Sequence, residues 1–204
     1  MIERKLARRS LLASFAGLAL PAAVPGGALA EPPWSARLIG AAQDQVGRTV
    51  IYDPAYVRLA YPGGDVPIER GVCCDVVVRA YRGAFGLDLQ KLVHEDMARA
   101  FSAYPRTWGL RRPDRNIDHR RVLNLETFFR RKGAALRFSG PADFQPGDLA
   151  TLRLPGNLPH IVIIGSRRAP SGRYACIHNV GRGAQVEDVL AEWPLVGRFR
   201  FAPL

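Results

Sequence analysis

The amino-acid sequence changes character near residue 134. Before this point, apolar residues recur at helical spacing, as in residues 73–86 and 88–105, and Gly133 is a typical helix end. After it, short apolar or alternating runs such as "GDLATLRLP", "PHIVIIGS" and "RYACIHNV" are separated by Gly, Pro and Asn. Helices followed by strands bury their apolar faces by packing on one another. We therefore predict an α+β domain whose N-terminal helices pack on an antiparallel β-sheet.

The first 30 residues have the pattern of a cleavable export signal. A cationic start with Arg8-Arg9 precedes an apolar stretch over residues 11–24, and Ala28-Leu29-Ala30 has the small-x-small form of a cleavage site. The arginine pair indicates a twin-arginine signal, and a Sec signal stays open. The apolar stretch is too short for a membrane span. We expect a single domain over residues 31–204, periplasmic or secreted after cleavage near Ala30, with no stable membrane insertion.

The chain is strongly basic. Its formal net charge is +11, and removing residues 1–30, with four basic residues and one acidic residue, leaves +8, nearly all of it arginine. Outside the cytoplasm such a charge suits peptidoglycan or another anionic envelope polymer, although a solvated basic surface explains it equally well. No groove-reading motif is present, so we expect no nucleic-acid partner. We expect a monomer.

The segment "CCDVVVRAYRGAF" begins with two adjacent cysteines. Its valines favour a strand, but the spacing of its apolar residues favours a helix that starts at Cys73. Asp75 and Arg79 would then form an i,i+4 ion pair on another face. Free N–H groups and the positive end of the helix dipole stabilise a thiolate, so Cys73 is a candidate nucleophile. The alternative is a small buried apolar residue.

Two histidines could supply a base for this thiol. His160 opens the apolar run "HIVIIG", and His178 ends "RYACIHN", where it shares a strand face with Cys176. A strand-borne histidine facing the helix-borne Cys73, with a second ring to orient it, follows the logic of catalytic triads. Each histidine alone is as consistent with a structural role. Zinc-ligand spacings are absent from the sequence, so we expect no metal and no cofactor.

Several segments resemble known families. "CCDVV", "FQPGDLATL", "PHIVIIG" and "YACIHNVG" are similar to the NlpC-type cell-wall peptidases, which are papain-like enzymes. More narrowly, "GVCCDVVVRAYR", "DLQKLVHEDM", "DRNIDHRRVLNLETFF" and "GDLATLRLPGNLPHIVII" resemble domain-of-unknown-function family 1287, from about residue 40 to the C-terminus. The resemblance implies a papain-like fold with Cys73 as nucleophile, His160 as base and His178 as its orienting partner.

The chain departs from that pattern beside the nucleophile. The peptidases usually have Ser, and the narrower family often Thr, where this chain has Cys74, and Asp75 stands where a small residue is common. Which thiol reacts therefore stays open. Because an odd number of cysteines in an oxidising compartment leaves one unpaired, a Cys74–Cys176 disulfide would leave Cys73 free.

The segment "DRNIDHRRV" concentrates polar side chains: Asp114, Asn116, Asp118, His119 and Arg120. Its Asp-x-Asn-x-Asp spacing is that of a calcium loop, but the required glycine and the bidentate glutamate are missing, so calcium is rejected. The segment is either a turn joined by salt bridges or a substrate-binding loop whose arginines hold a carboxylate. The resemblance favours substrate binding by these five residues.

Together these features predict an exported cysteine hydrolase that cleaves amide bonds in peptidoglycan stem peptides, as an endopeptidase or amidase, through an acyl-enzyme. The alternative is a non-catalytic envelope-binding module on the same scaffold that docks on anionic wall polymers.

Overall fold

The structure is a computed structural model that describes residues 33–203, which form one compact unit. The predicted export signal and its cleavage site near Ala30 lie outside the described residues. The helical part comes first in the described chain, with α1 (Trp34–Gln43), α2 (Cys73–Phe85), α3 (Leu89–Arg99) and α4 (Val122–Arg131). The helix predicted to start at Cys73 is confirmed. No helix among these residues has the length and hydropathy needed to cross a membrane.

Local sequence sets where the central helices begin and end. Gly86 adopts a left-handed conformation with φ of 66° and ends α2, as glycine does at many helix C-termini. Two residues later, the Asp88 carboxylate accepts a hydrogen bond from the Gln90 N–H and caps α3. The short turn between α2 and α3 follows from these two residues. Single 3₁₀ turns occupy Phe101–Ala103, Asp118–Arg120, Pro141–Asp143 and Pro155–Asn157.

The second half of the chain builds the main sheet. Its strands are β3 (Ala135–Leu136), β4 (Leu149–Leu154), β5 (Leu158–Arg168), β6 (Tyr174–Asn179), β7 (Ala184–Glu187) and β8 (Leu195–Phe199). They lie in the order β3-β8-β4-β5-β6-β7, with every neighbouring pair antiparallel. A separate two-stranded parallel pair joins β1 (Ile51–Tyr52) to β2 (Arg70–Gly71). The helix-first, antiparallel-sheet organisation confirms the predicted α+β class.

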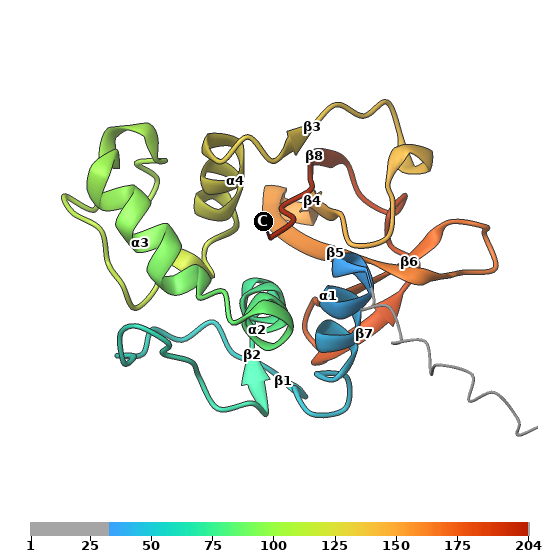
Figure 1. The fold of residues 1–204 in the computed structure, drawn as a ribbon, viewed down its shortest axis with the longest axis horizontal. Coiled ribbons are helices and arrows are strands. Elements are labelled where there is room, and N and C mark those ends of the chain that lie inside the picture. Colours follow the sequence, from blue (N-terminus) through green and yellow to red (C-terminus); the bar gives the residue numbers. More distant parts are fainter. Residues whose placement is uncertain (1–32, 204) are drawn as a thin grey trace, which may run out of the picture. The chain divides into compact units, whose positions relative to one another are not determined.

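Helices α1, α2 and α4 pack on one face of the sheet, and α2 lies between α1 and α3 (Figure 1). Every α2 residue from Cys73 to Tyr81 is buried, so this helix is packed on nearly all sides. The alternation of β5 divides the core: Ile161 and Ile163 pack with the helices, whereas Val162 and Ile164 belong to a smaller cluster on the other face.

The Cys74–Cys176 disulfide, considered above as a hypothesis, is not formed. All three cysteines are free and buried. Cys74 packs in the cluster between the helices and the sheet, whereas Cys176 packs in the cluster on the opposite face. A disulfide needs Cα atoms within about 7 Å, and a sheet layer separates these two side chains. The reason is strand alternation: Ile177, next to Cys176, is the residue that faces the helices.

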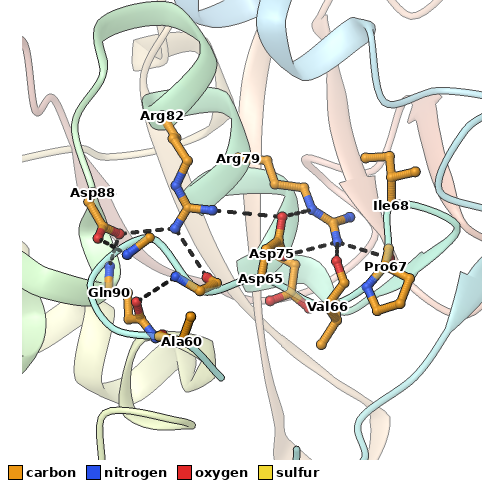
Figure 2. Close-up of polar contacts among 12 residues, drawn as sticks. Ala60, Asp65, Val66, Pro67, Ile68, Asp75, Arg79, Arg82, Asp88 and Gln90 are labelled. Carbon is orange, nitrogen blue, oxygen red and sulfur yellow. Dashed lines mark hydrogen bonds and ion pairs between the residues drawn. The ribbon is translucent and has the colours of Figure 1, made fainter. Parts of the chain in front are cut away.

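The irregular loop between β1 and β2 is held against α2 by two arginines (Figure 2). The buried Arg79 guanidinium donates to both Asp65 carboxylate oxygens, at 2.8 and 3.1 Å, and to the Val66, Pro67 and Arg70 carbonyls. One turn later, Arg82 donates to the Gly64 carbonyl. These side chains satisfy loop carbonyls that lack sheet partners.

Because Arg79 is buried and has several acceptors, Arg79→Ala should lower the free energy of unfolding by about 3 kcal/mol. The matched control is Arg70→Ala, since Arg70 pairs with Asp53 at 3.0 Å but is 47% exposed. An exposed pair contributes about 1 kcal/mol or less. Urea unfolding of the two variants measures both losses, and equal losses would contradict the role given to Arg79.

Candidate active site

Cys73 is the first residue of α2 and lies at the end of the sheet where β5 begins. Its sulfur interacts with the Cys74 thiol, the His160 ring and the Ile161 N–H. The pKa of Cys73 is held well below its usual value, first by the Cys74 hydrogen bond and next by His160, against the opposing effect of burial. These neighbouring groups therefore favour the thiolate form of Cys73.

The neighbouring thiol has the opposite character. Burial raises the pKa of Cys74 well above its usual value, and the negative charge of Cys73 raises it further. Cys74 is completely buried among core residues, whereas Cys73 borders a pocket and has an imidazole partner. The charged form is therefore favoured at Cys73 and disfavoured at Cys74. The adjacent cysteines are not equivalent.

The two predicted histidines are in contact. His160 Nε2 lies 2.9 Å from His178 Nδ1, with the ring planes 77° apart. Since Nε2 is engaged, His160 Nδ1 is the nitrogen left for the Cys73 sulfur. Burial, and next the neighbouring His160, lower the pKa of His178 to about 3, so this ring is neutral and its Nδ1 can accept the His160 proton. The structure thus brings Cys73, His160 and His178 into one chain of contacts.

An acidic residue, Glu187, lies next to His178 at the end of this series of contacts. His178 Nε2 lies 3.2 Å from Glu187 Oε2, although the contact is too bent to be a hydrogen bond. Glu187 also pairs with Arg182 at 2.7 Å. A neutral His178 that accepts at Nδ1 carries its proton on Nε2, so its interaction with the Glu187 carboxylate at 3.2 Å is electrostatic. Sequence analysis did not find Glu187, because β7 is a short strand whose pairing with β6 is not visible in the sequence.

Cys73 lines a pocket of about 190 Å³. The lining residues are Tyr52, Pro54, Val72, Cys73, Trp108, Ile117, Arg120, Val122, Leu123 and Pro159. Most of these side chains are apolar, and Cys73 itself is 4% exposed. The pocket therefore offers a small, mostly apolar space beside Cys73.

A buried ion pair fixes the start of α2. Arg120 binds the Asp75 carboxylate through Nε and Nη2, each at 2.9 Å. The same guanidinium donates to the carbonyls of Asp53 and Ala55, so it also holds the segment that forms one wall of the pocket. Asp75 in turn accepts a hydrogen bond of 2.6 Å from the Val72 N–H. The predicted Asp75–Arg79 pair is wrong, because the buried carboxylate takes a partner from outside its helix.

The five residues of the predicted substrate-binding loop differ in burial and do not line one site. Asp114 and Asn116 line a second hollow on the surface. Asp118 and His119 are buried: burial raises the pKa of Asp118 to about 6 and lowers that of His119 to about 4. Arg120 borders the Cys73 pocket, but its donors are engaged within the protein. Over residues 33–203, no three His, Cys, Asp or Glu side chains are grouped to hold a metal ion.

The fold and this site define a small α+β protein with a cysteine–histidine–histidine constellation. A family model described as "Domain of unknown function (DUF1287)" matches residues 39–201, and the chain belongs to this family. It is also 49% identical over 203 residues to "Uncharacterized protein YijF" of Escherichia coli (strain K12), covering 98% of both chains. The site from Cys73 to Glu187 lies within both matches.

If His160 stabilises the thiolate, its removal should raise the pKa of Cys73. We expect His160→Ala to move the midpoint of iodoacetamide labelling at Cys73 upward by about 1–3 pH units, the usual effect of losing a nearby opposite charge. Labelling rates measured by peptide mass against pH give this midpoint. The control is His94→Ala, a histidine on α3 that contacts Tyr61. An unchanged midpoint in His160→Ala would contradict the role of His160 in stabilising the Cys73 thiolate.

Glu187→Gln tests the last residue in the series of contacts that runs from Cys73 through His160 and His178. Loss of the carboxylate should weaken the orientation of His178 and raise the same labelling midpoint, by less than His160→Ala does. Asp188→Asn removes an equal charge one residue away, where the side chain pairs with Arg173, and serves as the control. Equal shifts in the two variants would show a general charge effect and contradict a specific role for Glu187.

Proposed function

We propose that this protein is an exported, papain-like cysteine hydrolase of the NlpC type that cleaves amide bonds in peptidoglycan stem peptides. The observation that carries the proposal is the position of Cys73 at the start of α2, next to His160, whose Nε2 lies 2.9 Å from His178 Nδ1. A helix-borne thiol against a strand-borne imidazole on an antiparallel sheet is the arrangement of papain-like enzymes. The export pattern of residues 1–30 and the basic surface support an envelope substrate.

The geometry supports acyl transfer. The Cys73 sulfur attacks the carbonyl carbon of a bound amide, and the oxyanion forms near the unpaired N–H groups of the first turn of α2. His160, protonated at Nδ1, gives this proton to the leaving amine, which releases the first product. His160 then takes a proton from water, whose oxygen attacks the thioester and restores the thiolate. The neutral His178 holds the imidazole during both steps.

The two thiols have different roles in this scheme. Cys74 is fully buried and retains its proton, so it acts on the reaction only through its contact with Cys73. Cys176 lies on the other face of the sheet, where burial raises its pKa to about 12. Cys73→Ala should therefore reduce the release of peptides from purified sacculi by at least about 10³-fold. Cys176→Ala should retain activity.

Mass analysis of the soluble muropeptides measures both rates and identifies the bond that is cleaved. Full activity in Cys73→Ala would refute the hydrolase. A folded wild-type protein that binds sacculi without releasing peptides would favour the envelope-binding module, whose binding should be insensitive to alkylation and weaken strongly with salt.

A further inference from the structure

A second and larger hollow, of about 790 Å³, lies on the surface of the protein. Its lining residues are Tyr56, Arg58, His94, Gly109, Leu110, Arg111, Arg112, Pro113, Asp114, Arg115 and Asn116. We call this hollow the arginine cleft, because four of these side chains are guanidinium groups. Its residues come from the loop after β1, from α3 and from the segment before Asp118.

The positive charge of the arginine cleft is largely uncompensated. Within residues 33–203, Arg58, Arg111 and Arg112 form no ion pair, and all three are exposed. By contrast, arginines such as Arg79 and Arg120 are buried against carboxylates. Three unpaired guanidinium groups around one concave surface create a positive potential that attracts an anion.

Polar side chains in the lining of the arginine cleft are hydrogen-bonded to one another. The carboxylate of Asp114, the acid in its lining, accepts from the Tyr56 hydroxyl at 3.0 Å and from the Asn116 N–H and side-chain amide, each at 2.9 Å. Asn116 also accepts from the Leu59 N–H at 3.0 Å and so joins the two walls. Asp114 is thus occupied within the protein, and the arginines remain available to a ligand.

The arginine cleft and the Cys73 pocket run along the same two segments. Residues 52–58 and 108–117 contribute side chains to both hollows, with neighbouring positions facing one or the other. Because both hollows border the same two segments, a substrate that fills both would follow these segments. The occupant with an amide bond at Cys73 and anionic groups in the cleft is an acidic peptide.

We propose that the arginine cleft binds the carboxylates of an acidic peptide whose amide bond lies at Cys73. This inference rests on the proposed hydrolase and adds to it the charge of the substrate and the residues that hold it. Guanidinium groups bind carboxylates through two parallel hydrogen bonds, which positions a peptide as well as attracting it. Arg58, Arg111 and Arg112 are then specificity residues of the enzyme.

Binding is measured by calorimetry in a Cys73→Ala background, where no turnover occurs. The probes are a synthetic peptide amide with three glutamates and the same peptide with three glutamines. Arg111→Gln with Arg112→Gln should weaken binding of the glutamate peptide about tenfold, as expected for two partly exposed ion pairs. The glutamine peptide should bind weakly to both proteins, and salt should reduce the difference between the two peptides.

The matched control is Arg48→Gln with Arg167→Gln, which removes the same charge from exposed positions outside the cleft. Equal weakening by the two double variants would overturn the site, as would tight binding of a phosphate polymer with no binding of the glutamate peptide. The binding assay uses Cys73→Ala, so it reports on the arginine cleft alone. A failure of the proposed hydrolase activity is therefore distinguishable from a failure of the proposed binding site. Wild-type protein that releases peptides from sacculi but does not discriminate between the probes would overturn the cleft alone.

Discussion

The candidate site depends on one buried carboxylate. Asp75 accepts the Val72 N–H at the start of α2 and receives the guanidinium of Arg120, which also holds the carbonyls of Asp53 and Ala55. Through this ion pair the helix start and a wall of the Cys73 pocket become one rigid unit. Both charges are nearly inaccessible to water, so removal of either would leave the other buried and unpaired. The position of the nucleophile is therefore tied to the fold.

Burial affects the protonation of three groups in the site: Cys73, Cys74 and His178. Removal from water favours the neutral forms of Cys74 and His178, so the first acts as a donor and the second can accept. Cys73 is also buried, but the contacts with Cys74 and His160 outweigh that cost and stabilise its charged form. Cys74 and His160 thus favour negative charge on the Cys73 sulfur in spite of its burial.

Sequence reasoning located the parts of the site that follow from local patterns. The apolar spacing after Cys73 predicted a helix start, and the runs ending in or opening with histidine predicted strands, all of which the structure contains. It failed where the outcome depends on a partner from elsewhere in the chain. Asp75 pairs with Arg120 rather than with Arg79, and Cys176 faces away from the helices. Glu187 was missed because its role arises only from the pairing of β6 with β7.

The sequence by itself determined the α+β class, the helix that begins at Cys73 and the strands that carry His160 and His178. These features follow from the spacing of apolar residues and the positions of glycines, which set the local backbone conformation. Only the tertiary structure decided that the two rings lie within hydrogen-bonding distance, that the pKa values of Cys73 and Cys74 shift in opposite directions and that unpaired arginines gather around one hollow. Those properties depend on segments that are distant in the sequence. Such segments bury a side chain and supply the groups that it contacts. Neither burial nor partner choice is encoded in the neighbours of a residue along the chain.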